Sequence, residues 1–218
     1  MKKVFLLITL LCAVPLLAVP AAQSAPAAKK KAGGKEKKKV ATPRDYANTL
    51  ATLQTDMGDI TMKFFYDKAP KHVENFVDLA ASGFYDGTMF HRVIPGFMIQ
   101  GGDPFTKKAE DPMHPYGTGG NMVDGKEQRL KAEFNDTPHK RGIVSMARSS
   151  DPNSASSQFF IVVKDSGFLD NQYSAFGEVV SGMDVADKIA ATPRGANDRP
   201  NAPIRIKKIL LTQAKSTS

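Results

Sequence analysis

Residues 90–103 read Phe-His-Arg-Val-Ile-Pro-Gly-Phe-Met-Ile-Gln-Gly-Gly-Asp. This stretch predicts a strand, a Pro-Gly turn and a second apolar run that ends at Gly-Gly-Asp. Such runs normally fill a core, yet Arg92 and Gln100 stand among Phe90, Phe97 and Met98. Arginine is always charged and is rarely buried without a partner. The stretch therefore predicts either a core arginine with a satisfied partner or a shallow apolar pocket with one strong hydrogen-bond donor.

Two later stretches share this mixture of apolar and polar residues. Residues 142–148 read Gly-Ile-Val-Ser-Met-Ala-Arg, and residues 157–161 read Ser-Gln-Phe-Phe-Ile. Residues 168–170 read Phe-Leu-Asp, with Tyr173 shortly after them. In this order the three stretches closely resemble the motifs of cyclophilins, the peptidyl-prolyl cis-trans isomerases. The resemblance covers about residues 48–213 and leaves out the first forty or so residues.

Short apolar runs and turn residues alternate through this region. Residues 48–55 and 59–65 predict a β-hairpin, and helical spacing after Pro70 predicts a helix that stops at Gly83. Further strands are predicted at 143–147, 158–163, 173–180 and 204–212, a long surface loop at 106–131, and a second helix at 183–190. This pattern alone allows an all-β barrel or a sandwich. The resemblance implies a mainly β fold, a closed eight-stranded antiparallel β-barrel capped by two α-helices, with the site on its outer face.

The N-terminal residues differ in composition from the rest. Residues 1–25 have a basic start, a short apolar run and small residues, which predicts a cleaved secretory signal peptide. Residues 26–45, rich in Lys and Ala, predict a disordered linker. Residues 46–214 form the predicted isomerase domain, and 215–218 a short tail. Residues 1–45 hold ten Lys and Arg against two Asp and Glu, so the remaining chain, with twenty of each, is neutral.

The only cysteine, Cys12, lies inside the apolar run of the predicted signal peptide. A lipid-anchoring cysteine is expected after such a run, so we do not expect lipidation. Cleavage would leave a mature protein without cysteine and without a disulfide. We expect a monomer with no stable membrane span after cleavage. It is expected to be exported, with the periplasm as the favoured destination and the cell envelope or the medium as the alternatives. The basic arm is interpreted as a solvated spacer, and export argues against nucleic acid as a partner.

Rotation about an X-Pro amide crosses a barrier of roughly 20 kcal/mol because the C–N bond is partly double. A catalyst needs a dry cleft for the proline ring and a donor aimed at its nitrogen, but no nucleophile and no cofactor. The resemblance implies that Arg92 is this donor and that Gln100 holds the guanidinium group. It implies that the proline pocket and its borders are formed by Phe97, Met98, Phe160 and Leu169, by the backbone of Ala147 and Arg148, and by Gln158, Tyr173 and the adjacent His91. A structural hydrogen bond is the favoured role of His91 over catalysis.

Three residues depart from the best-known cyclophilins. Phe168 stands where many members have Trp, Tyr173 where many have His, and Arg148 where Asn is frequent. Losing an indole N–H removes one donor at the rim of the groove. We therefore expect weak binding of the cyclic peptide cyclosporin together with retained isomerase activity.

Other functions are less consistent with the sequence. The four histidines are dispersed, no Gly-x-Ser-x-Gly motif is present, and neither His-Glu-x-x-His nor paired cysteines indicate a metal site. The remaining alternative is a cyclophilin barrel that binds peptide as a chaperone or scaffold with little catalysis. The expected partners are proline-containing, unfolded or nascent exported polypeptides, on which the enzyme would accelerate X-Pro rotation during folding.

Overall fold

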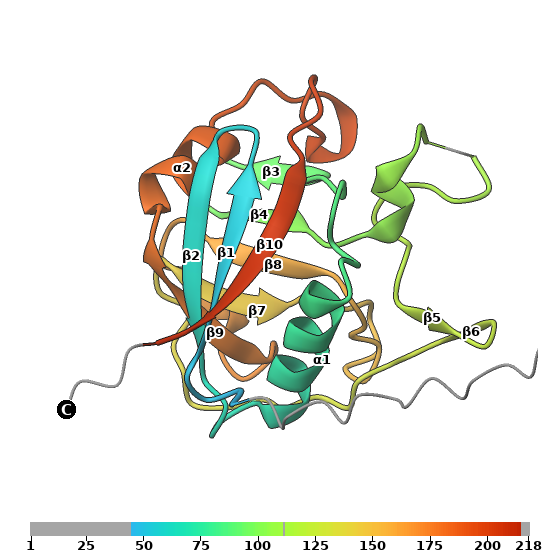
Figure 1. Cartoon of the computed structure of the whole chain (residues 1–218). Helices are drawn as coiled ribbons and strands as arrows, with labels where there is room; N and C mark the ends of the chain where they lie inside the picture. The colour runs from blue at the N-terminus through green and yellow to red at the C-terminus, as the bar shows by residue number, and fades with distance from the viewer. Residues whose placement is uncertain (1–44, 111, 215–218) are drawn as a thin grey trace, which may run out of the picture. The chain divides into compact units, whose positions relative to one another are not determined.

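A curled antiparallel sheet organises the protein. The computed structural model describes residues 45–110 and 112–214. Eight strands follow the order β10-β1-β2-β9-β7-β8-β4-β3 (Figure 1). Their bounds are β1 Thr49–Thr55, β2 Gly58–Phe64, β3 Arg92–Ile94, β4 Met98–Gly101, β7 Ile143–Met146, β8 Phe159–Val162, β9 Ala175–Ser181 and β10 Ile206–Gln213. The predicted signal peptide, nearly all of the predicted linker and the predicted tail lie outside the described residues.

The first two strands form the hairpin that the sequence predicts. Leu53 pairs with Ile60 and Thr55 with Gly58 across the turn. Gly58 has φ +127, a backbone conformation that side chains rarely adopt. Alternate residues of β1 are buried, as expected for a strand with one face toward a core.

The predicted closure of the barrel is wrong, because the sheet curls only into a half-barrel. Its edge strands, β10 and β3, are not paired with each other. An isolated bridge joins Met89 to Arg205, and the Phe90 N–H donates to Ile204 O at 3.0 Å. Strand β3 has only three residues, since the turn at Pro95-Gly96 follows it, and is too short to form a ladder along β10. Most of the fold was therefore predicted, but not the gap between its edges.

Both predicted helices are confirmed. Helix α1 covers Pro70–Ala81 and helix α2 covers Met183–Ala190. In Figure 1 they lie at opposite ends of the curled sheet. Proline opens α1, where its missing N–H costs nothing. The buried face of α1 carries Val73, Phe76 and Val77, at the spacing that the sequence predicts.

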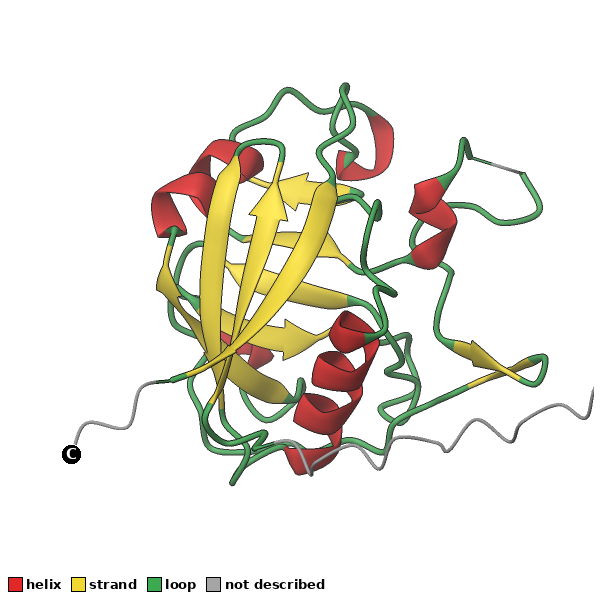
Figure 2. Ribbon diagram, in the orientation of Figure 1, coloured by secondary structure: helices red, strands yellow, loops and turns green. Residues whose placement is uncertain are grey.

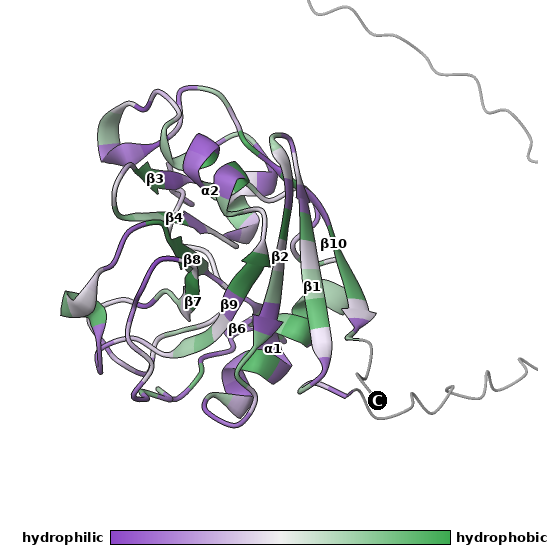
Figure 3. Ribbon diagram, turned by 90° about the vertical axis from the view of Figure 1, so that its left-hand side faces the viewer, coloured by the Kyte–Doolittle hydropathy of each residue, from purple (hydrophilic) through white to green (hydrophobic). Residues whose placement is uncertain are grey.

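The main core lies inside the curl of the sheet. The Phe76 ring packs against Phe64, Tyr85, Phe159 and Phe176, with ring centroids 5.0–5.7 Å apart. This buried set has members on each of the eight strands of the curled sheet, and we call it the inner cluster. In Figure 3 the hydrophobic colour is concentrated on the strands and the hydrophilic colour on the connecting loops.

A second, smaller apolar set lies on the other face of β4 and β8. It consists of Met98, Phe160, Val162 and Leu169, with Ile94, Phe97, Ala147 and Tyr173 packed against it. We call it the outer cluster. Because successive residues of a strand face opposite sides, Ile99 and Phe159 belong to the inner cluster, while Met98 and Phe160 next to them belong to the outer one.

The predicted long loop carries some regular structure. The short helix η1, Pro104–Lys107, overlaps its start, and a small hairpin of β5, Met122–Val123, and β6, Lys126–Glu127, lies within it (Figure 2). Two further short helices are η2, Gly167–Leu169, and η3, Ala196–Asp198. Among the residues with described positions, no helix is both long and apolar enough to cross a membrane.

Candidate active site

A cavity of about 100 Å³ opens over the outer cluster. All of the residues that line it are among those predicted from the sequence. They are Arg92, Phe97, Met98, Gln100, Ala147, Arg148, Phe160, Leu169 and Tyr173. The structure therefore brings together residues from three separate stretches of the chain, and Arg92 lies at an apolar cavity rather than in the core.

Strand register places the polar and aromatic groups in one row. Arg92 on β3 pairs with Gln100 on β4, Gln100 pairs with Phe160 on β8, and Phe160 pairs with Ser145 on β7. Directly opposed residues on one face have Cβ atoms about 5 Å apart. The row therefore carries a cation, a carboxamide and an aromatic ring side by side across the sheet.

Arg92 has a different partner from the one predicted. Its Nε lies 3.6 Å from Asp198 Oδ2, while the Gln100 side chain donates to Gln158 Oε1 at 2.9 Å. The Arg92 side chain is 43% exposed. Gln100 thus does not hold the guanidinium in this structure, and Asp198, which the sequence did not indicate, is the acidic neighbour of Arg92.

Aromatic contacts shape the walls of the cavity. The Phe160 and Tyr173 rings meet edge to face, with centroids 5.5 Å apart. The Arg148 guanidinium lies 4.7 Å from the centre of the Tyr173 ring, and its Nε donates to Gln172 O at 3.0 Å. The side chain of Arg148, which stands where many cyclophilins have Asn, is therefore held against the rim of the cavity.

Phe168 does not line the cavity. Its relative exposure is 66%, and its ring lies 5.4 Å from that of Phe97. Phe168 therefore extends the apolar rim outward from the wall. An aromatic residue here offers surface to a bound chain but no side-chain hydrogen bond.

A buried polar chain lies beneath the cavity. One ring nitrogen of His139 is 2.9 Å from Asp170 Oδ1, and the other is 2.8 Å from Ser145 Oγ. The backbone N–H of His139 also donates to Asp170 at 2.7 Å, and these bonds, the backbone one foremost, lower the pKa of Asp170. The His139 ring stacks on Phe160. This chain joins η2, which carries Leu169, to β7 across the floor of the site.

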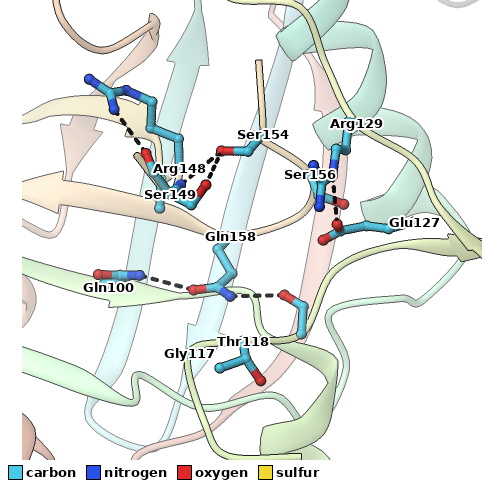
Figure 4. Close-up of a pocket in the computed structure, with 12 residues that line it drawn as sticks. Gln100, Gly117, Thr118, Glu127, Arg129, Arg148, Ser149, Ser154, Ser156 and Gln158 are labelled. Carbon is cyan, nitrogen blue, oxygen red and sulfur yellow. Dashed lines mark hydrogen bonds and ion pairs between the residues drawn. The ribbon is translucent and has the colours of Figure 1, made fainter. Parts of the chain in front are cut away.

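A larger, polar cavity of about 320 Å³ adjoins the first (Figure 4). Gln100, Ala147 and Arg148 line both cavities. Gln158, predicted as a border residue, lines the larger one and donates to Gly119 O at 2.8 Å. Sequence reasoning missed several of its lining residues, namely Glu127, Arg129, Ser149, Ser154 and Ser156. They are common surface residue types, and only the path of the loops brings them together.

His91 lines neither cavity. Its ring is almost fully buried, and neither ring nitrogen has a hydrogen-bond partner within residues 45–110 and 112–214. The Met89 backbone nevertheless lies near enough to the ring to raise the pKa of His91 against the effect of burial. Burial lowers the pKa of His91, and the nearby Asp103 opposes that shift. His91 is therefore held neutral behind the site.

The cavity over the outer cluster combines an apolar floor with two permanent cations, Arg92 and Arg148. None of the residues that line it is a Ser, Cys, His, Asp or Glu. The described residues also hold no group of three His, Cys, Asp or Glu side chains placed to hold a metal ion. The site can grip an apolar ring and present a guanidinium to it, but it has no paired nucleophile and base of the kind that hydrolysis requires.

Comparisons with known proteins agree with this geometry. The family model described as cyclophilin type peptidyl-prolyl cis-trans isomerase/CLD matches residues 50–210. A peptidyl-prolyl cis-trans isomerase of Arabidopsis thaliana is 42% identical over 160 residues, covering 73% of this chain and 94% of the relative. A probable peptidyl-prolyl cis-trans isomerase of Brucella abortus is 43% identical over 168 residues, covering 76% of this chain and 83% of the relative.

Solved structures show the same likeness. A Cryptosporidium parvum cyclophilin-type isomerase superposes with a TM-score of 0.68 at 32% identity, covering 77% of this chain and 99% of that one. The same protein crystallised in the presence of the dipeptide Ala-Pro gives a TM-score of 0.67 and 33% identity, covering 75% of this chain and 99% of that one. The matched family model spans all three sequence motifs and the cavity that they form. The chain therefore belongs to the cyclophilin-type peptidyl-prolyl cis-trans isomerases.

Proposed function

We propose that the enzyme rotates X-Pro bonds by donation from Arg92 to the prolyl nitrogen. As the amide twists, resonance is lost and the nitrogen gains a lone pair that a donor can stabilise. One observation carries the assignment: the Arg92 guanidinium borders the same cavity as Phe97, Met98 and Phe160. A proline ring seated on these side chains would bring its nitrogen within reach of the Arg92 guanidinium, whereas the other arginine of the cavity, Arg148, is held against Tyr173.

The size of the proposed contribution can be estimated. A charge-assisted hydrogen bond contributes about 1.5–3 kcal/mol. If it forms only in the twisted state, it accelerates rotation by about ten- to a hundredfold. The remaining acceleration would come from removing water around the amide in the apolar cavity.

The residues around the cavity would orient the polypeptide. The backbone of Ala147 and Arg148 would pair with the extended substrate at the end of β7. The bonded pair of Gln100 and Gln158 forms a polar border between the two cavities. The larger cavity would receive a side chain that flanks the proline, and Tyr173 and Phe168 would cover the ring from the rim.

The proposed clients are exported polypeptides whose slow prolyl steps limit folding. The signal-like composition of residues 1–25 supports a periplasmic destination. The neutral net charge of residues 46–218 supports binding of varied chains without a strong electrostatic preference. N-terminal sequencing of the purified mature protein, together with fractionation of the cells, tests this part: retention of residues 1–25 in a cytosolic product would contradict it.

The catalytic proposal is tested with a protease-coupled assay on an Ala-Pro-Phe peptide. The wild-type protein should accelerate isomerisation, and Arg92→Ala should lower kcat/KM about ten- to a hundredfold. An unchanged rate in a folded Arg92→Ala protein would refute the donor role.

The alternative, a peptide-binding chaperone with little catalysis, is tested in the same samples. It requires that the wild-type protein binds the proline peptide without accelerating its isomerisation. The exposed Phe168 at the rim favours some chaperone-like contact with unfolded chains in addition to catalysis. Suppression of client aggregation by Arg92→Ala protein would separate the two activities.

A further inference from the structure

Asp198 lies between two arginine side chains at the open edge of β3. Its Oδ2 is 3.6 Å from Arg92 Nε, and its Oδ1 accepts a hydrogen bond from Arg194 Nε at 3.1 Å. Each carboxylate oxygen therefore faces a different guanidinium group. Among the residues with described positions, Asp198 is the ion-pair partner of Arg92, and no hydrogen bond is made by the terminal nitrogens of Arg92.

The backbone around Asp198 is held in an unusual conformation. Asn197 has φ +59 and Asp198 has φ +57, so two consecutive non-glycine residues are left-handed. Each such residue costs on the order of 1 kcal/mol and persists only where its surroundings fix it. The Gly195 N–H donates to Arg199 O at 2.8 Å, and a bridge joins Arg194 to Pro200. These bonds close a short loop that presents the carboxylate.

The next residue anchors this loop to the opposite wall. Arg199 forms two hydrogen bonds with Glu110, at 2.5 and 2.7 Å, and its guanidinium lies 4.8 Å from the centre of the Tyr116 ring. Tyr116 immediately precedes Gly117 and Thr118, which line the larger cavity. The position of Asp198 is therefore fixed from both sides, by Arg194 within the loop and by Arg199 across it.

We propose that Asp198 is a positioning residue that orients Arg92 for catalysis. An arginine side chain has several rotatable bonds, so fixing it in one conformation costs conformational entropy. If the side chain is already fixed in the free enzyme, this cost no longer adds to the activation free energy. By facing Nε, Asp198 leaves the two terminal nitrogens of Arg92 available to the prolyl nitrogen. The inference rests on the proposed donor role of Arg92.

The ion pair is more than a third exposed, so its effect on stability should be small. Its effect should appear in the rate instead. This expectation separates a positioning role from a structural one, because a purely structural residue would change unfolding before it changed turnover.

The test uses Asp198→Asn, which removes the charge but retains a side chain that tolerates left-handed backbone. We expect kcat/KM to fall about two- to fivefold, mainly through kcat. Asp136→Asn is the matched control: it also removes one exposed, ion-paired carboxylate, but Asp136 pairs with Lys68, which lines neither cavity. The control should retain the wild-type rate.

A double-mutant cycle shows whether Asp198 acts through Arg92. In an Arg92→Ala background, Asp198→Asn should change kcat/KM by less than twofold, because the group that it orients is gone. An unchanged rate for Asp198→Asn alone would overturn the proposal. So would a loss that multiplies with that of Arg92→Ala, since Asp198 would then act independently of Arg92.

A spectroscopic measurement does not depend on activity. The ¹H–¹⁵N resonance of Arg92 Nε, assigned by its disappearance in Arg92→Lys, should shift in Asp198→Asn and remain in place in Asp136→Asn. If Arg92→Ala leaves the rate unchanged, the donor role fails, while this resonance still decides whether Asp198 orients the side chain. An unmoved resonance in Asp198→Asn would overturn the contact itself.

Discussion

Phe159 and Phe160 are consecutive residues of one strand, yet they belong to different parts of the protein. Phe159 packs edge to face against Phe76 and Tyr85 in the inner cluster. Phe160 faces the other way, packs against Tyr173 and lines the cavity. Both are almost fully buried in the free protein. Burial therefore does not distinguish a core residue from a site residue, whereas the side of the sheet does.

The two clusters also differ in what surrounds them. The inner cluster is closed by helix α1 and by its own aromatic contacts. The outer cluster is small, lies under an open cavity and is adjacent to Arg92 and Gln100. The comparison indicates that the inner cluster supplies stability and the outer one supplies a binding surface. The following predictions test that division.

The largest expected effect is on stability. Phe159→Ala should lower the free energy of unfolding by about 3–5 kcal/mol, because it leaves a cavity among packed rings. Phe160→Ala, one residue along, should cost clearly less, since its ring already borders open space. Chemical denaturation of both variants measures the difference.

The rates of the two variants should follow the opposite order. Phe160→Ala should lower kcat/KM through KM, and the folded fraction of Phe159→Ala should retain the wild-type value. Equal stability losses together with equal rates would remove the distinction between the clusters.

The second effect sharpens the role of the cation. Arg92→Lys keeps the charge but replaces a planar fork of donors with a single ammonium group. We expect a loss in kcat/KM smaller than the about ten- to hundredfold loss of Arg92→Ala. The protease-coupled assay measures it, with thermal unfolding as the control. A lysine variant as slow as the alanine variant would show that geometry, and not charge, accounts for the whole contribution.

The third effect concerns two buried histidines, His72 on α1 and His91 just before β3. Burial lowers the pKa of His72, against the opposing contact with Glu133, and burial also lowers the pKa of His91. Below about pH 6.5 the unfolded chain then binds more protons than the folded protein, so stability should fall as the pH decreases from 7.5 to 5.5. Each histidine can contribute at most about 1.4 kcal/mol per pH unit.

Urea denaturation at the two pH values measures this slope. His91→Gln should flatten it and leave the contribution of His72 in place. A slope that is the same in wild-type and His91→Gln protein would contradict the neutral, buried state of His91.

The smallest effect concerns the exposed rim. Phe168→Trp adds one indole N–H next to Phe97, a hydrogen bond that contributes about 0.5–1.5 kcal/mol. Cyclosporin should bind the wild-type protein weakly and the variant about two- to tenfold more tightly. Fluorescence titration measures both affinities. Nanomolar binding to the wild-type protein would be inconsistent with the expectation drawn from Phe168.

Most of the fold could be predicted because local signals agreed with it. Pro70 and the spacing of Val73, Phe76 and Val77 define α1, and Gly58 defines the first hairpin. The half-barrel could not be predicted, because a run of apolar residues does not show whether β3 pairs with β10 along enough residues to close the barrel. That extent depends on the path of the chain before Arg92, where turns replace a strand.

The cavity could be predicted from the motifs, whereas contacts with residues outside the motifs were missed. Arg92, Met98, Gln100 and Phe160 lie on strands and Leu169 on η2, while the other lining residues lie in adjoining turns and loops, and the resemblance covers both groups. Asp198 is more than a hundred residues from Arg92 in the sequence. Its position depends on the left-handed backbone of Asn197 and Asp198, which no local sequence pattern predicts. The hydrogen bond between Gln100 and Gln158 was not predicted either, because the two residues lie far apart in the sequence.

The buried chain of Ser145, His139 and Asp170 has the composition of a serine hydrolase triad. The Ser145 side chain is fully buried, so its hydroxyl cannot reach the acyl group of a substrate. Fluorophosphonate reagents, which label activated serines, should therefore leave the protein unmodified. The three residue types that hydrolyse substrates in other enzymes have a structural role here: they link η2 to β7 beneath the isomerase site.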